Sequence, residues 1–267
     1  MSTTGTILDK ILEAKRAELA RRQREMPLSE LESRVREAPF PHNLSGALWG
    51  DRVRLIGETK KASPSKGLLA REYDPVALAS TYAANGAAAI SVLTEVDHFQ
   101  GSLEHLAAVK AAVGPEGVPV LRKDFLFDPY HLFEARAHGA DAALLIVAAL
   151  SPERLRELLD AAQRVWLQCL VEVHDEQELE TALSAGAEII GINHRDLRTF
   201  QVDISLSSRL RPLIPQGRMV VAESGINSSE DVAALRQTGV HGILVGEALM
   251  TAPDVGEKVR ELAGVQA

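Results

Sequence analysis

Charged residues end four apolar segments of the sequence, and their side chains suit acid–base chemistry. The segments are residues 53–60, 118–124, 165–173 and 218–224. Their charged ends are Glu58 with Lys60, Lys123 with Asp124, Glu172, and Glu223. Lys and Glu side chains that are clustered and partly removed from water undergo the pKa shifts that proton transfer needs. A fold that brings these four ends together would therefore create a site for proton transfer.

Two short segments could bind a phosphate group. One is ESGINSSED at 223–231, and the other is VGEALM at 245–250, in which EALM is typical of the first turn of a helix. Ser224, Gly225 and Gly246 would leave backbone N–H groups unobstructed, and amides at helix N-termini carry a partial positive charge that favours phosphate. Glycines also close many strand–helix turns for steric reasons, so the prediction depends on the two segments lying side by side.

Two other loops contain side chains that suit anionic groups. The polar, turn-rich segment 60–67 includes Ser63, and it is either a rigid anion-binding loop or a solvated basic loop. The segment 192–200 places Asn193 and Arg195 directly after an apolar run. Because an arginine side chain can grip a planar carboxylate with two hydrogen bonds, Arg195 is a candidate carboxylate-binding residue.

A repeated phrase indicates the elements that must position these residues. NGAAAISVL at 85–93 recurs in altered form at 138–147, 185–193 and 238–246. In each copy a glycine follows a helical run and an apolar strand comes next, so we expect the glycines in the left-handed cap position. They are Gly86, Gly139, Gly186 and Gly239. Together with the four charged segments, the copies predict eight strands that alternate with helices.

This alternation predicts an α/β fold of the TIM (β/α)8-barrel type, with residues 1–267 as one domain. An open doubly wound sheet is the alternative, but it does not require evenly spaced copies, and the chain has no GxGxxG turn. In a barrel, each interior layer takes its side chains from alternate strands, and active sites lie at the C-terminal strand ends. Four charged residues should then meet in one layer at the barrel mouth: Lys60, Lys123, Glu172 and Glu223.

Residues 6–50 are expected to form a helical extension and a connector within that domain. Apolar residues at helical spacing predict an amphipathic helix that Pro27 interrupts, and a second, shorter helix follows it. The connector at 39–50 contains two prolines. We expect this extension to pack on the main domain.

The composition excludes several classes of protein. The 267 residues are 46% hydrophobic and carry a formal net charge of −8, so neither nucleic acid nor an anionic membrane surface is a suitable partner. The N-terminus lacks the apolar run of a signal peptide, and no segment has the roughly 18 apolar residues of a membrane helix, so we expect a cytoplasmic protein. The single cysteine, Cys169, is expected to be a buried core residue. No metal and no cofactor are predicted, and we expect a monomer or a weak homo-oligomer.

Several stretches form a specific combination of motifs. They are GETKKASPSKG (57–67), SVLTEVDHFQGS (91–102), VLRKDFLFDPY (120–130), LVEVHD (170–175), GINHRDLRTF (191–200), AESGI (222–226) and VGEALM (245–250). In this combination the chain resembles the indole-3-glycerol phosphate synthase family over essentially its whole length. The resemblance implies a carboxy-lyase that converts 1-(2-carboxyphenylamino)-1-deoxyribulose 5-phosphate to indole-3-glycerol phosphate, CO2 and water.

The resemblance also implies roles for the charged residues. Lys123 would be the acid that protonates the ketose carbonyl, and Glu172 would orient it and exchange protons. Glu58 and Lys60 would assist, and either Lys60 or Glu172 would be the second acid. Two residues would hold substrate hydroxyls and the carboxylate network: Glu223 and Asn193.

Each part of the substrate is expected to have its own contacts, again by resemblance. The benzoate would meet Arg195 and Ser63. The phosphate would meet Lys60, Ser224, Gly225, Gly246 and the backbone N–H of Glu247, whose side chain we expect to point away. The apolar walls would be Phe99, Phe125 and Leu197. One departure from the family is His194, which stands where asparagine is common.

Two alternatives remain open. A sister phosphate-binding barrel such as phosphoribosylanthranilate isomerase would need an Asp–Cys acid–base pair, whereas Cys169 is expected in the middle of a strand. A catalytically silent barrel that acts as a binding or scaffold protein would be favoured by the loss of a charged strand-end residue, and none is missing.

Overall fold

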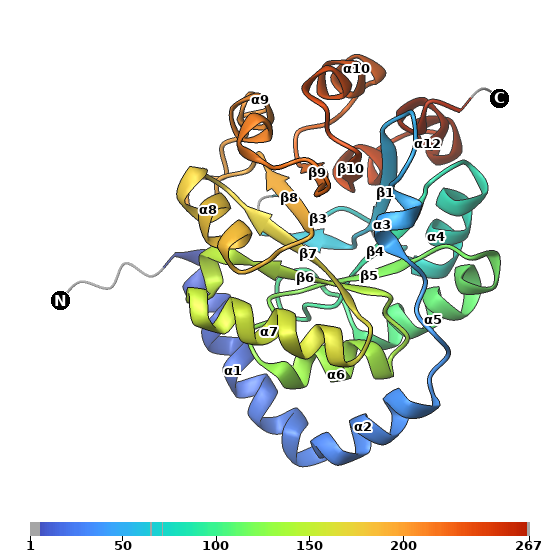
Figure 1. Ribbon diagram of the computed structural model, residues 1–267. Helices are drawn as coiled ribbons and strands as arrows, with labels where there is room; N and C mark the ends of the chain where they lie inside the picture. Colours follow the sequence, from blue (N-terminus) through green and yellow to red (C-terminus); the bar gives the residue numbers. More distant parts are fainter. Residues whose placement is uncertain (1–5, 65, 71, 266–267) are drawn as a thin grey trace.

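A closed barrel of eight parallel strands forms the centre of the molecule (Figure 1). The structure, a computed structural model, describes residues 6–64, 66–70 and 72–265. The order of strands around the barrel is β1-β10-β9-β8-β7-β6-β5-β4. Their bounds are β1 Arg54–Thr59, β4 Ala89–Leu93, β5 Val120–Lys123, β6 Ala142–Ile146, β7 Gln168–Val173, β8 Ile189–Asn193, β9 Met219–Glu223 and β10 Gly242–Val245. The predicted (β/α)8 barrel is confirmed, and the open sheet is excluded.

Helices cover the outside of the barrel and alternate with its strands. They are α4 Pro75–Ala84, α5 Leu103–Val113, α6 Pro129–Ala137, α7 Pro152–Arg164, α8 Glu176–Ser184, α9 Leu206–Leu210, α10 Ser229–Thr238, α11 Glu247–Met250 and α12 Val255–Ala263. Short 3₁₀ turns follow α5, β6 and α9: η1 Gly114–Glu116, η2 Val147–Ala149 and η3 Arg211–Leu213. Many helices begin where the side chain of an Asp or Ser accepts a hydrogen bond from the backbone of the first turn, as Asp74 does for α4 and Asp128 for α6.

The repeated glycines have the backbone conformation that the sequence predicts. Gly86, Gly139, Gly186 and Gly239 have φ angles of 104°, 88°, 92° and 86°. Residues with a Cβ rarely adopt this left-handed region, so glycine lets each helix end there and the next strand begin within a few residues.

The core has two layers because neighbouring residues of a strand face opposite sides. Ile56 and Leu121 belong to the cluster inside the barrel, whereas Leu55 and Val120 belong to the cluster between strands and helices. Cys169 lies in that outer cluster, and burial raises the pKa of its thiol to about 12. Cys169 is therefore a core residue, as the sequence predicts.

The N-terminal extension consists of α1 Ile7–Glu25 and α2 Leu28–Glu37, with the break at Pro27 that the sequence predicts. Figure 1 shows both helices in blue outside the barrel, with α2 near α6. Buried ion pairs join α1 to the barrel: Lys15 Nζ lies 2.9 Å from Asp124 Oδ2, just after β5, and Arg22 lies 2.8 Å from Glu134 on α6. Tyr130 donates to the backbone carbonyls at the end of α1.

Two loops contain more regular structure than the sequence indicates. The connector includes one helical turn, α3 Leu44–Ala47, because the side chain of Asn43 accepts a hydrogen bond from Gly46 N. The segment after β1 forms a small antiparallel hairpin of β2 Ala62–Ser63 and β3 Gly67–Leu68.

We predict that Lys15→Met destabilises the protein by about 2–3 kcal/mol, because Asp124 is fully buried and would lose one of its two cationic partners. The free energy of unfolding, measured with denaturant, checks this. The matched control is Arg21→Ala, which breaks the exposed pair with Glu25 and should cost less than about 1 kcal/mol. Equal losses in the two variants would contradict a structural role for the buried pair.

Candidate active site

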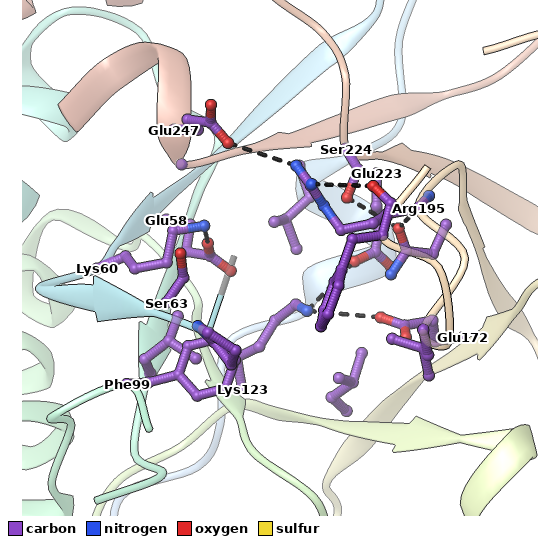
Figure 2. A pocket seen from close by; sticks show the side chains of 18 of the residues that line it. Glu58, Lys60, Ser63, Phe99, Lys123, Glu172, Arg195, Glu223, Ser224 and Glu247 are labelled. Atoms are coloured by element: carbon purple, nitrogen blue, oxygen red, sulfur yellow. Dashed lines mark hydrogen bonds and ion pairs between the residues drawn. The ribbon is translucent and has the colours of Figure 1, made fainter. Parts of the chain in front are cut away.

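A cavity of about 440 Å³ opens at the C-terminal ends of the barrel strands. Every residue that the sequence analysis proposed for the site lines this cavity: Glu58, Lys60, Ser63, Phe99, Lys123, Phe125, Glu172, Asn193, Arg195, Leu197, Glu223, Ser224, Gly225, Gly246 and Glu247. Figure 2 shows charged side chains from several strands pointing toward one another across it. The barrel thus brings together residues that lie far apart in the sequence.

One ammonium group stands between two carboxylates in the cavity. Lys123 ends β5, and its Nζ lies 3.5 Å from Glu172 Oε2 of β7 and 3.5 Å from Glu223 Oε2 of β9 (Figure 2). A second ammonium, Lys60 Nζ, lies 2.7 Å from Glu58 Oε1 of β1. The three carboxylates are buried. They come from alternate strands of the barrel, as the layer argument predicts.

This arrangement keeps Lys123 protonated. Burial alone would lower the pKa of a lysine, but the negative charges of Glu172, Glu223 and Glu58 outweigh it and raise the pKa of Lys123 above its ordinary value. Likewise, burial would raise the pKa of Glu58, but the nearby Lys60 and Lys123 lower it. Lys123 and Glu58 are therefore held in their charged forms.

The two carboxylates beside Lys123 differ in their ionisation. Burial opposes the charge on Glu172, but Lys123, His174 and Asn193 together hold the pKa of Glu172 well below its usual range. Burial and the like charges of Glu172 and Glu58 dominate at Glu223 and raise its pKa to about 8, in spite of Lys123. Pairs of titratable groups whose pKa values are driven apart in this way often mark sites of proton transfer.

The two glycine-containing loops lie in the same cavity, as their proposed role requires. Ser224 has a φ of 69°, which is unusual for a residue with a side chain. Its hydroxyl donates to Asn193 Oδ1 at 2.8 Å, and its carbonyl oxygen lies 2.8 Å from Nδ1 of His194. At Gly246, which precedes α11, a Cβ would lie 2.5 Å from Glu58 Oε1, so a larger residue would require the Glu58 carboxylate to shift.

His194 supports the loop after β9 from behind. It is buried and outside the set of cavity-lining residues. A carbonyl can only accept, so Nδ1 donates to Ser224, and Nε2 then accepts from the Ser207 hydroxyl at 2.7 Å. Burial lowers the pKa of His194, which is consistent with this neutral ring. His194 thus lies outside the proton-transfer groups.

The expectation for the side chain of Glu247 is wrong. Instead of pointing away, its carboxylate lies 3.4 Å from Arg195 Nη2 and 3.1 Å from Lys66 Nζ (Figure 2). These two cations offset the repulsion that a carboxylate would otherwise exert on an anion in the cavity. Lys66 is a lining residue that the sequence analysis did not single out.

The first turns of α1 also reach the cavity, which the sequence did not indicate. Ile7, Leu8 and Ile11 line it, and they add to the apolar side formed by Phe99 and Phe125, whose rings lie 6.1 Å apart. The apolar stripe of the helix was visible in the sequence, but nothing in it indicated which end of the barrel the helix would cover.

His174 is a second omission, and a signal for it did exist. Its Nε2 lies 3.3 Å from Glu172 Oε1. The signal was its position only two residues after Glu172, directly after the charged segment 165–173. Among the described residues, no group of three or more His, Cys, Asp or Glu could hold a metal ion. No helix in the described ranges is long and apolar enough to cross a membrane.

Solved structures that resemble this one at low identity support the fold. Thiamine phosphate pyrophosphorylase from Pyrococcus furiosus has a TM-score of 0.64 at 21% identity, and the match covers 83% of this chain and 96% of that chain. The 3-hexulose-6-phosphate synthase from Salmonella typhimurium has a TM-score of 0.65 at 15% identity, over 79% of this chain and 97% of that chain.

Sequence comparisons are far more specific. The family model for indole-3-glycerol phosphate synthase matches residues 8–262. The indole-3-glycerol phosphate synthase of Dehalococcoides mccartyi strain CBDB1 is 50% identical over 96% of this chain and 99% of its own length. That of Roseiflexus sp. strain RS-1 is 52% identical over 97% of this chain and 98% of its own length. With its barrel, its strand-end charges and these relatives, the chain belongs to the indole-3-glycerol phosphate synthase family.

Proposed function

We propose that the chain catalyses the ring-closing decarboxylation and dehydration of 1-(2-carboxyphenylamino)-1-deoxyribulose 5-phosphate to indole-3-glycerol phosphate, CO2 and water. Family membership supports the reaction. The observation that carries the mechanism is the Lys123 ammonium, which stands between two buried carboxylates in a cavity that also contains both phosphate-type loops.

The cavity offers suitable surroundings for each end of this substrate. Ser224, Gly225, Gly246 and the backbone N–H of Glu247 are proposed to bind the phosphate together with Lys60. Arg195 and Ser63 are proposed to bind the benzoate, which requires Arg195 to exchange its contact with Glu247 for the substrate carboxylate. Phe99, Phe125 and Leu197 would pack on the aromatic ring.

In the first step, the ring carbon that bears the carboxylate attacks the ketose carbonyl carbon. The carbonyl π electrons move to oxygen, and that oxygen takes a proton from Lys123. An alkoxide is basic enough to accept a proton even from an ammonium whose pKa is raised. The carbon–carboxylate bond then breaks, CO2 leaves, and its electron pair restores the aromatic ring.

Loss of water needs an acid that protonates the leaving hydroxyl. It also needs a base that removes a proton from the carbon next to the ring nitrogen. The pair of Lys60 and Glu58 meets both needs, because an ammonium and an ionised carboxylate lie 2.7 Å apart. We therefore assign Lys60 as the second acid and Glu58 as the base, while Glu172, whose lowered pKa keeps it ionised, orients Lys123. Glu223 and Asn193 would hold substrate hydroxyls.

The alternative of a phosphoribosylanthranilate isomerase finds no support in the site. Its Asp–Cys pair would require a cysteine in the cavity, and Cys169 lies in the outer core layer instead. The silent-scaffold alternative does not account for buried charges that are paired inside an open cavity.

Three further assignments complete the proposal. We take residues 1–267 as one domain, because α1 both lines the cavity and is tied to the barrel by buried ion pairs. A cytoplasmic location follows from a phosphorylated biosynthetic substrate, and a monomer or weak homo-oligomer is proposed.

We predict that the purified protein converts the carboxyphenylamino deoxyribulose phosphate with the appearance of indole fluorescence. Lys123→Ala should lower kcat by at least about 10²-fold while leaving KM nearly unchanged, because an acid acts mainly in the transition state. Lys10→Ala, on the exposed side of α1, is the control and should retain wild-type turnover. No fluorescence from folded wild-type protein would overturn the proposed function, and near-normal kcat in Lys123→Ala would remove Lys123 from the role of acid.

A second prediction concerns the pH dependence that Glu223 creates. Its carboxyl is protonated below a pKa of about 8 and becomes negative above it. Because the substrate is an anion, kcat/KM should fall as the pH rises through this value. In Glu223→Gln this fall in kcat/KM should disappear, although the maximum kcat/KM of the variant should be lower than that of the wild type. Identical pH profiles for the two proteins would show that Glu223 does not titrate in this range.

A further inference from the structure

The two oxygens of Glu172 are divided between two cationic side chains. Oε2 lies 3.5 Å from Lys123 Nζ in the cavity, and Oε1 lies 3.3 Å from His174 Nε2. Lys123 lines the cavity, whereas His174 is not among the lining residues, so it stands behind Glu172 and out of reach of a substrate. His174 can therefore act on the reaction only through Glu172.

A second carboxylate fixes the ring of His174 from the other side. Glu178 Oε2 lies 2.9 Å from His174 Nδ1 and also accepts a hydrogen bond from the backbone N–H of His174 at 2.8 Å. Glu178 is itself held in the first turn of α8, where its backbone N–H donates to Asp175 Oδ1 at 2.8 Å. The imidazole thus has a defined orientation that the start of α8 imposes.

Glu223 provides a contrast inside the same cavity. It lies at the same 3.5 Å distance from Lys123 as Glu172 does, and both carboxylates are buried. No histidine is paired with Glu223 among the described residues. The main difference between the two carboxylates is thus the cationic partner behind Glu172.

We propose that His174 is a positioning residue for the reaction: fixed by Glu178, it binds one oxygen of Glu172 and leaves the other directed at Lys123. The inference rests on the proposed function, since it assigns His174 to the support of the acid in that reaction. It adds a residue outside the cavity to the groups on which turnover depends.

The charges around His174 and Glu172 agree with a positioning role for His174. Burial would lower the pKa of His174, but Glu172 and Glu178 outweigh it and raise that pKa to about 10, so the ring is an imidazolium at neutral pH. The other charged groups that act on Glu172 are Lys123 from β5, Glu223 from β9 and Glu58 from β1. The 3₁₀ turn η2, which packs against β7 and α8, contributes only apolar residues.

The test replaces His174 by a ring of similar shape that cannot donate. His174→Phe leaves the backbone N–H that Glu178 accepts from, so the start of α8 keeps this bond. We expect kcat to fall roughly 10- to 100-fold with KM nearly unchanged, because a small displacement of a reacting group has effects of this size. Without the imidazolium the pKa of Glu172 rises, so the acid side of the kcat–pH profile should move to higher pH.

A milder variant covers the case in which His174→Phe does not fold. Glu178→Gln keeps an acceptor for the backbone N–H of His174 but removes the negative charge that fixes the imidazolium. Like His174→Phe, it should lower kcat and move the acid side of the kcat–pH profile to higher pH, but by a smaller amount. His241→Gln, beside the N-terminal end of β10 and away from the cavity, is the matched control and should keep the wild-type profile.

A readout that does not need turnover separates this inference from the proposed function. In protein with ¹³C-labelled glutamate carboxyl groups, the Glu172 signal should titrate at a higher pH in His174→Phe or Glu178→Gln than in wild type. Wild-type kcat and an unchanged Glu172 titration in the variants would overturn the inference. Absence of activity in wild type, together with a shifted Glu172 titration in the variants, would overturn the proposed reaction but leave the coupling of His174 to Glu172 in place.

Discussion

The charge balance around Lys123 is the constraint on which the rest of the site depends. An ammonium and three carboxylates are taken out of water at the end of a barrel whose interior contains a cluster of apolar side chains. Such burial is costly unless the charges compensate one another. The barrel meets this condition by its geometry: β1, β5, β7 and β9 each contribute to one layer, so opposite charges from distant parts of the chain come within ion-pair distance. The result is a set of proton donors and acceptors in which Lys123 is held protonated and Glu172 is held ionised before a substrate enters.

The same principle organises the structure around the cavity. Asp124, the neighbour of Lys123, is held by Lys15 of α1, Arg122 and Thr94, so the residue next to the acid also anchors the helix that closes the apolar side of the cavity. At the opposite side, Asn193 and His194 hold Ser224 in its left-handed conformation. Groups on both sides of the cavity are thus fixed by neighbouring side chains, and His174 behind Glu172 is a further example.

The sequence predicts those parts of the fold and site that depend on local pattern. The glycine-and-strand repeat predicts the eight strands, and the position of a charge at a strand end predicts which side chains meet, because topology dictates both. What it could not predict depends on long-range packing. The apolar stripe of Ile7, Leu8 and Ile11 is compatible with many docking positions, and contacts that are remote in sequence, such as the buried Lys15–Asp124 pair, place it at the cavity. Glu247 turns toward Arg195 and Lys66, and those cations come from loops that are remote in sequence.

The most direct test of this account is the ionisation of Lys123 itself. In protein with ¹⁵N-labelled lysine, the Nζ signal of Lys123 can be assigned by its absence from Lys123→Gln and then followed by NMR as the pH is raised. If three buried carboxylates govern the site, Lys123 remains an ammonium beyond the ordinary lysine value of 10.5. A neutral amine at or near neutral pH would contradict the account, because burial would then outweigh the carboxylates and Lys123 would not be an ammonium that can protonate the ketose oxygen.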